Sequence, residues 1–259
     1  MKILTMCAVS ALALSACASA FAADASKANV YRVFNDSVAP ADQDAYEAAG
    51  KAYNQCLHDH GFKFTWNAWN HETGDVYTYS YVAGPYNWAD FDAMHAAGKA
   101  CDATWRKMAN PHLKGETSAF LVGHPEMSHM PKDSDGSPPH GMIEVIDFTL
   151  KPGHEAHEAF ANGAKKIAAA AEKSNWSGHF AIYEIRDGGD GAPNYLVLLP
   201  AKDWADVGME ANPTLWKMVE GVNGKSEADA TRKSINDSIE KSSSHVDSYN
   251  ADLTYTAAK

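Results

Sequence analysis

The stretch Trp88-Ala89-Asp90-Phe91-Asp92-Ala93-Met94 has a counterpart in Trp204-Ala205-Asp206-Val207-Gly208-Met209, 116 positions further along the chain. Around each copy the residue patterns follow the same order. A short apolar run typical of a strand precedes an amphipathic helical run, two strand-like runs joined by a turn, and the Trp-Ala-Asp start of a second helix. We therefore expect the chain to use one structural unit twice.

In the first copy, the patterns predict a strand over residues 30–34, a helix over 41–60, a hairpin over 62–83, a helix over 88–110 and a closing strand over 118–122. In the second copy they predict a strand over 142–150, a helix over 153–173, a hairpin over 178–199 and a helix over 204–219. An extra helix over 226–242 and a last strand over 245–255 follow. Each copy thus has the order β-α-β-β-α-β, the ferredoxin-like arrangement.

This element order resembles the dimeric α/β-barrel superfamily, in a tandem, single-chain form. The resemblance covers nearly the whole mature chain and implies an α+β fold in which two ferredoxin-like halves, 28–125 and 141–255, form one pseudo-symmetric barrel-like body. Superfamily members include cofactor-free monooxygenase-like enzymes and haem proteins similar to chlorite dismutase. A fold of this kind hosts many functions, so the resemblance assigns no functional residue.

The first hairpin has one aromatic and one polar face. Pairing Trp69 with Val76 places Trp66, Tyr79 and Tyr81 on the aromatic face, and the polar face then carries Thr65, Asn67, Trp69, Thr78 and Ser80. Either the aromatic face lines a ligand pocket, or it packs under helices and the polar face lines the pocket. The candidate ligand-binding residues from both copies are Trp66, Trp69, Tyr79, Tyr81, Ile182, Tyr183 and Tyr195.

Residues 126–140 are rich in proline, serine, aspartate and glycine, which is typical of a linker between the halves. Histidine and methionine are frequent around the first residues of this segment, at His124, Met127, His129 and Met130. Imidazole and thioether groups are ligands that suit copper. A copper site here is the alternative to an ordinary linker.

Residues 1–23 have the pattern of an export signal, with Lys2, an apolar core and the small residues before Asp24. Leu14-Ser15-Ala16-Cys17 also resembles a lipobox, so the product is either periplasmic or secreted, or a lipoprotein anchored through Cys17. The mature chain then keeps Cys56 and Cys101, which we expect to form a disulfide in an oxidising compartment; two buried free thiols are the alternative.

The formal net charge of −11 and the absence of a lysine or arginine cluster argue against nucleic acid as a partner. No later stretch has the length of apolar residues that a membrane span needs.

No catalytic motif is present, and haem and copper both stay open as cofactors. We expect an exported protein that binds a small, partly apolar or aromatic molecule in a barrel-like pocket. If the protein is an enzyme, we expect a cofactor-light oxidoreductase. A homo-oligomer is possible. The alternative is a metal-handling or structural envelope protein without an enclosed site.

Overall fold

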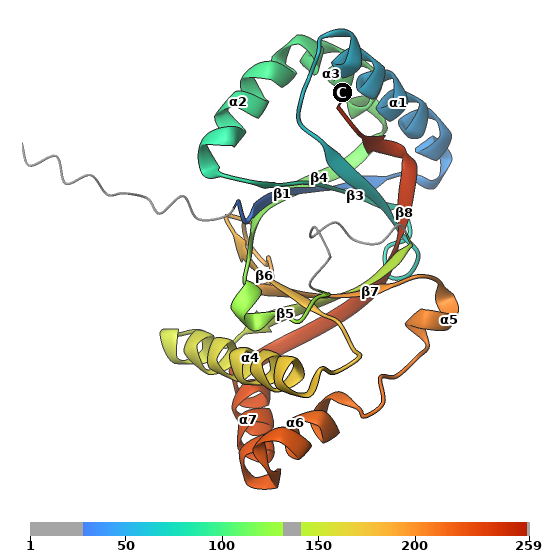
Figure 1. The fold of residues 1–259 in the computed structure, drawn as a ribbon. Coiled ribbons are helices and arrows are strands. Elements are labelled where there is room, and N and C mark those ends of the chain that lie inside the picture. The colour runs from blue at the N-terminus through green and yellow to red at the C-terminus, as the bar shows by residue number, and fades with distance from the viewer. Residues whose placement is uncertain (1–27, 132–140, 258–259) are drawn as a thin grey trace, which may run out of the picture.

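The computed structural model describes residues 28–131 and 141–257, and within them eight strands close into an antiparallel barrel (Figure 1). Around the barrel they follow the order β1-β3-β2-β8-β5-β7-β6-β4. The strands are β1 (Val30–Val38), β2 (Trp66–His71), β3 (Thr78–Tyr86), β4 (Leu113–Gly123), β5 (Met142–Leu150), β6 (Ala181–Arg186), β7 (Tyr195–Ala201) and β8 (Ile239–Tyr255). Closure gives each strand a hydrogen-bonded neighbour on both sides.

Helices cover the barrel on two opposite sides (Figure 1). They are α1 (Gln43–Asp59), α2 (Trp88–Gly98), α3 (Asp102–Met108), α4 (His154–Ser174), α5 (Trp204–Val207), α6 (Leu215–Asn223) and α7 (Lys225–Ser238). Helices α1 to α3 lie on the side of the first four strands, and α4, α6 and α7 on the side of the last four. Each helical layer encloses a core against the outer face of the barrel.

The strands of each half of the chain have the same neighbour order. In the first half the order is β4-β1-β3-β2, and in the second it is β8-β5-β7-β6. The two groups join at β2 with β8 and at β4 with β6. The barrel therefore depends on pairing between segments far apart in the chain.

The helices expected over 88–110 and 204–219 are both interrupted. The first breaks at a 3-10 turn, Lys99–Cys101, between α2 and α3. The second ends at Val207, and α6 begins only at Leu215. Pro213 lacks a backbone N–H and would break a helix that ran through it, so one continuous helix over 204–219 is disfavoured. Strand β1 runs four residues beyond its expected end at position 34.

The repeated Trp-Ala-Asp motif marks helix starts. Asp90 accepts a hydrogen bond from the backbone N–H of Asn87 at 2.9 Å, and Asp206 accepts one from that of Lys202 at 2.9 Å. A carboxylate in the first turn also suits the positive end of the helix. The motif therefore encodes local structure in both halves.

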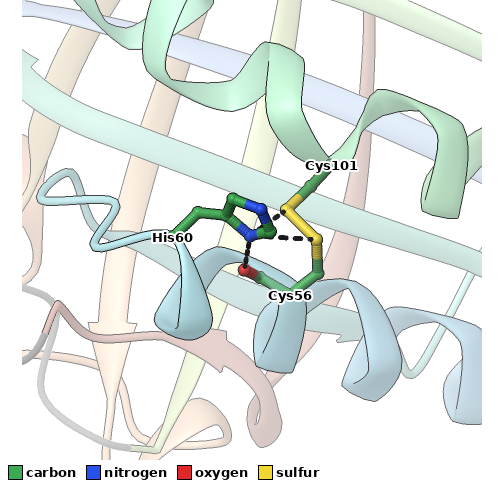
Figure 2. A group of neighbouring side chains, drawn as sticks. All are labelled: Cys56, His60 and Cys101. Atoms are coloured by element: carbon green, nitrogen blue, oxygen red, sulfur yellow. Dashed lines mark hydrogen bonds between the residues drawn. A yellow bond between two sulfur atoms is a disulfide. The ribbon is translucent and has the colours of Figure 1, made fainter.

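The expected disulfide is confirmed. Cys56 of α1 is bonded to Cys101 in the turn between α2 and α3, with their Cα atoms 5.9 Å apart (Figure 2). Cys101 is fully buried. The bridge ties together two helical segments of the same layer.

The first hairpin keeps its expected faces although its register differs. Trp69 pairs with Ser80 instead of Val76, four residues further along β3. An even shift leaves the same side chains on each face. Tyr79 and Ala68 are buried in the core against α1, while Trp69 packs with Ile143 and Val145 inside the barrel.

The first residues of the expected linker pack against the second half. Pro125–Met127 forms a 3-10 turn, and Met127 is 1% exposed in the core under α4. His129 then forms a β-bridge with Phe180. Residues 132–140 lie outside the described part of the chain, and so does the expected export signal over 1–23.

Candidate functional site

Among the described residues, a cavity lies on each side of the first hairpin. The larger, of about 790 Å³, is the barrel lumen, and the smaller, of about 400 Å³, lies between the outer face of the sheet and α1 to α3. Both are within the size range of small-molecule sites. The two alternatives drawn from the hairpin pattern therefore correspond to two different cavities.

The seven candidate ligand-binding residues fall into three groups. Trp69 and Tyr183 line the lumen. Trp66 and Tyr81 line the smaller cavity, and Tyr79 packs beside it in the core against α1. Ile182 and Tyr195 are buried under α4 in the core of the second half.

The smaller cavity, which we call the aromatic cleft, has walls of aromatic rings. It is lined by Tyr53, Phe62, Trp66, Tyr81, Phe91 and Trp105, together with Met94, Arg32, Asp36 and Glu116. The rings of Tyr53 and Trp66 are nearly parallel, with centroids 6.2 Å apart, and Trp105 meets Tyr53 edge-on at 5.2 Å. Such walls offer stacking and edge contacts to a flat ring.

A carboxyl group lies at the base of the aromatic cleft. Asp36 is 1% exposed, and its Oδ2 accepts a hydrogen bond from the Tyr46 hydroxyl at 2.5 Å. The Tyr46 oxygen is 2.8 Å from the Tyr81 hydroxyl, which therefore donates to it. Burial raises the pKa of Asp36 from 3.8 to about 7, against the lowering effect of the Tyr46 hydrogen bond and with a further raising effect from Glu116. This carboxyl group is thus poised to exchange a proton near neutral pH.

A guanidinium group lies in the same cavity. The Arg32 side chain stacks over Phe34 and Phe120, with its central carbon 4.7 and 5.0 Å from the ring centroids. Its Nη2 donates to Ser118 at 3.4 Å. Within residues 28–131 and 141–257, Nε of Arg32 and Oδ1 of Asp36 are both buried without a hydrogen-bond partner. An unpaired buried polar atom is costly, so a hydrogen bond from a ligand would stabilise either one. Neither atom has accessible surface, so a ligand reaches them only when a neighbouring side chain moves.

The matching place in the second half is filled. Phe148 lies opposite Tyr195 in the β5–β7 ladder, as Asp36 lies opposite Tyr79 in the β1–β3 ladder. Phe148 packs on Phe160, with centroids 5.5 Å apart, and both belong to the second core. The two helical layers therefore enclose different interiors, one hollow and polar at its base and the other apolar.

The lumen contains a separate cluster of ionisable side chains. His71, His245 and Asp247 line it together, with Asp147 on β5 nearby. Burial lowers the pKa of His71, although Asp247 acts against this. For His245 burial also lowers the pKa, but the contact with Asp247 outweighs it and raises the pKa overall. Sequence patterns missed this cluster because its members come from opposite ends of the chain.

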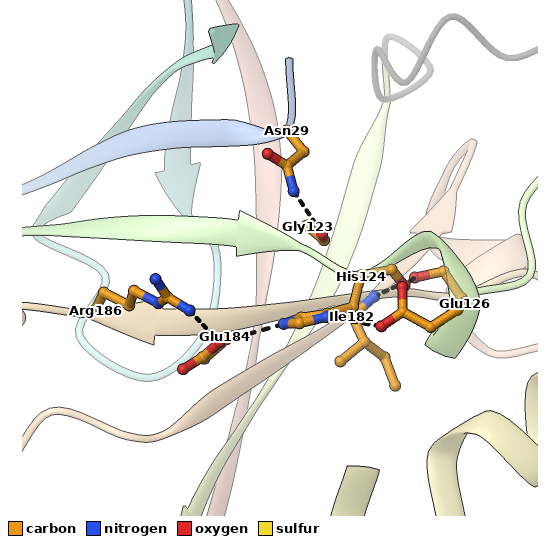
Figure 3. A network of polar contacts seen from close by, with 8 residues as sticks. Asn29, Gly123, His124, Glu126, Ile182, Glu184 and Arg186 are labelled. Carbon is orange, nitrogen blue, oxygen red and sulfur yellow. Dashed lines mark hydrogen bonds and ion pairs between the residues drawn. The ribbon is translucent and has the colours of Figure 1, made fainter. Parts of the chain in front are cut away.

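The four candidate copper ligands lie in separate surroundings. His124 lies between Glu126 and Glu184, at 3.1 and 3.3 Å, and Arg186 pairs with Glu184 (Figure 3). His129 contacts the Trp176 carbonyl at 3.0 Å instead. Met127 is buried in the core and Met130 follows the β-bridge. The structure thus gives the two histidines different partners.

A third group, Cys56, His60 and Cys101, has the spacing of metal ligands. Nδ1 of His60 is 3.7 Å from each sulfur atom and 2.9 Å from the Cys56 carbonyl (Figure 2). The sulfur ligand of a metal is the thiolate, and in the disulfide neither sulfur is one. This group therefore has a structural role in the oxidised protein.

The sequence comparisons give no relatives. No family model matches the chain, and no curated protein matches it. The comparison with solved structures does give matches. A proposed monooxygenase from Lactobacillus acidophilus superposes with a TM-score of 0.52 at 12% identity, covering 89% of this chain and 97% of that one. An anthrone oxidase-like protein superposes with a TM-score of 0.53 at 9% identity, covering 90% and 95%.

A chlorite dismutase from Candidatus Nitrospira defluvii matches at a lower TM-score of 0.48 and 12% identity, covering 87% of this chain and 93% of that one. At such identities the likeness concerns the fold alone. The chain has a mixed α+β fold with an eight-stranded antiparallel barrel, and the first two solved structures share its fold. The described helices include none long and apolar enough to cross a membrane.

Proposed function

We propose that the protein binds a flat, partly apolar or aromatic small molecule in the aromatic cleft and oxidises it without a bound cofactor, with Asp36 as the base. The observation that carries this proposal is that Asp36 and Arg32 line one aromatic cavity and each has a buried polar atom, Oδ1 and Nε, without a hydrogen-bond partner in the described chain. Natural proteins rarely leave such atoms unpaired away from a functional site. A ligand with an acidic proton next to a ring would use both.

The contrast between the two halves supports the same site. We propose that residues 28–125 and 141–255 are tandem ferredoxin-like repeats, on the strength of their shared strand order. Asp36 of the first repeat then corresponds to Phe148 of the second by its strand partner, and Tyr46 packs on Tyr79 as Phe160 packs on Tyr195. An apolar pair suffices to build the core, so the polar pair has a role other than folding.

The chemistry needs a base, a charge to stabilise an anion, and oxygen. Asp36, with a pKa near 7, accepts a proton from an activated C–H or O–H group at neutral pH. The positive charge of Arg32 stabilises the carbanion or oxyanion that remains. Molecular oxygen then takes electrons from this anion; with anthrone as substrate, one O2 gives anthraquinone and one water. No further electron donor is required.

We also propose that the protein works outside the cytoplasm. The disulfide between Cys56 and Cys101 supports this location, because disulfides persist in oxidising compartments. The signal-like pattern over residues 1–23 supports it as well. Anchoring through Cys17 is the alternative to a soluble periplasmic or secreted product.

Oxygen uptake in the presence of anthrone tests the proposal, with buffer alone as the blank. We expect wild-type protein to raise the uptake rate, and Asp36→Asn to lower the protein-dependent rate by about a hundredfold or more, the effect of removing a general base. Asp147→Asn is the matched control, since burial also raises the pKa of Asp147, which lies in the lumen. This control should keep the wild-type rate.

Tryptophan fluorescence separates binding from catalysis, because Trp66 and Trp105 both line the cleft. Quenching by anthrone in both wild type and Asp36→Asn, with turnover only in wild type, would support the cleft as the binding site and Asp36 as the base. Binding without turnover in wild type would leave a binding protein and remove the enzymatic part. Absence of both signals would remove the proposal as a whole.

A further inference from the structure

We propose that the barrel lumen contains a binding site for one divalent transition-metal ion, formed by His71, His245 and Asp247. This site lies on the opposite face of the sheet from the aromatic cleft and does not depend on the function proposed for that cleft. It also differs from the group of His124, which the sequence singled out. Its three ligands come from the seam at which the two halves of the chain meet.

The sheet register brings these residues together. His71 is the last residue of β2 and pairs directly with Asp247 of β8. His245 precedes Asp247 by two positions, so the alternation of the strand places both on the same face. That face is the lumen, which all three residues line. The closure of the barrel at β2 and β8 therefore builds the cluster.

The donor atoms converge on a small space. The candidate ligand atoms all lie within 4.8 Å of one another. Nε2 of His245 is 3.4 Å and Nε2 of His71 is 3.7 Å from Oδ1 of Asp247. The two imidazole rings are stacked, with centroids 4.2 Å apart and planes 22° apart. Ligands on one zinc ion, each about 2.1 Å from it, lie roughly 3.5 Å apart, which matches the two distances from the imidazole nitrogens to Oδ1.

Asp247 supplies a second, independent observation. Its side chain is 7% exposed, and Oδ1 is buried without a hydrogen-bond partner in the described chain. This oxygen is the atom that both imidazoles face. Its nearest polar neighbours are the two imidazole nitrogens, at 3.4 and 3.7 Å, and a cation between the three atoms would replace these long contacts with direct ones.

Neighbouring groups hold His71 in place. Ser80 donates a hydrogen bond to Oδ1 of Asn35 at 2.7 Å, and its oxygen lies 2.9 Å from Nε2 of His71. Because the Ser80 proton is used, its oxygen accepts the Nε2 proton of His71. Metal binding at Nε2 would move this proton to Nδ1. An imidazole of the pair that carries two protons must lose one to bind, so binding should release protons from that fraction and weaken as pH falls.

The ligand set indicates the class of ion. Two imidazoles and one carboxylate suit zinc, cobalt and iron in the divalent state, whereas calcium and magnesium prefer oxygen ligands alone. Three protein ligands leave coordination positions open, and here these would face a lumen of about 790 Å³. A small molecule with an oxygen donor could then reach the ion.

Calorimetric titration of Zn²⁺ into chelator-treated, oxidised protein tests the site. We expect one equivalent to bind with proton release, measured by repeating the titration in buffers of different ionisation enthalpy. His71→Gln, His245→Gln and Asp247→Asn should each weaken binding by at least about a hundredfold, beyond the effect of losing a supporting group. His124→Ala is the control, because it removes an imidazole that lies between two carboxylates elsewhere, and it should bind like wild type.

X-ray absorption of the zinc-loaded wild type provides a measurement that needs no variant. Two imidazoles and only nitrogen and oxygen in the first shell would agree with the site, while sulfur ligands would assign the ion to Cys56 and Cys101 and overturn it. The absence of stoichiometric binding would also overturn the proposal. So would binding that survives in the His71→Gln/His245→Gln double variant or disappears in His124→Ala.

Discussion

The Tyr46 hydroxyl donates a 2.5 Å hydrogen bond to Oδ2 of Asp36, inside a layer that elsewhere packs aromatic and aliphatic groups. This hydrogen bond lowers the pKa of Asp36, while burial raises it by a larger amount. Tyr46→Phe should therefore raise the pKa of Asp36 further. We expect the pH profile of anthrone-dependent oxygen uptake to move to higher pH in this variant. An unchanged profile would show that the carboxyl group does not control the rate.

The pKa of Asp36 also predicts how stability depends on pH. The folded state holds the proton up to about pH 7, whereas the unfolded chain releases it near 3.8. The stability associated with this proton is thus present at low pH and is lost as pH rises from about 4 to 7. Over that range wild type should lose on the order of 4 kcal/mol relative to Asp36→Asn. Urea unfolding at a series of pH values measures the difference, with Asp92→Asn as the control for removing an exposed carboxylate. A constant difference across this range would contradict the prediction.

The disulfide should contribute to stability through the unfolded chain. Cys56 and Cys101 are separated by 45 positions, and a loop of that length corresponds to about 4 kcal/mol in the chain-entropy model. We expect the Cys56→Ala/Cys101→Ala variant to unfold at a clearly lower urea concentration than oxidised wild type. Reductant should lower the midpoint of wild type and leave that of the variant unchanged. Equal midpoints for wild type and variant, each measured with and without reductant, would contradict this role.

Met127 should behave as a core residue although it lies in a segment with linker composition. It is 1% exposed, and Met→Ala at such sites costs about 2–5 kcal/mol. Met209 is 71% exposed, so Met209→Ala should change stability by less than about 0.5 kcal/mol. Thermal unfolding of the two variants provides a matched comparison. Similar effects of both would show that the segment after β4 does not pack as described.

Local patterns in the sequence predict much of this fold. The alternation in the first hairpin assigns its faces correctly even with the wrong partner for Trp69, because an even shift preserves them. The pairing of Cys56 with Cys101 is predicted from the expected oxidising compartment, and the structure contains it. The composition of residues 126–140 favours a linker, but composition does not reveal that Met127 packs against a hydrophobic surface under α4.

The site residues were harder to predict for two physical reasons. Asp36 lies in Asn35-Asp36-Ser37, which favours a turn, and so β1 was expected to end at position 34. Every second residue, Arg32, Phe34 and Asp36, faces the helices, and this alternation is the signal that could have predicted a longer β1. His71 and His245 belong to different halves, and only barrel closure brings them together. Such non-local contacts leave no local pattern in one sequence.

Photolabelling with benzophenone, a diaryl ketone, tests the central claim most directly, because peptide mass spectrometry then identifies the residues beside the bound rings. The account predicts insertion into the walls of the aromatic cleft, at residues such as Tyr53, Met94 and Trp105, and loss of labelling when anthrone competes. Insertion instead at Val145, Leu196 or Leu198 would place the ligand in the barrel lumen and contradict the assignment of the cleft as the binding site.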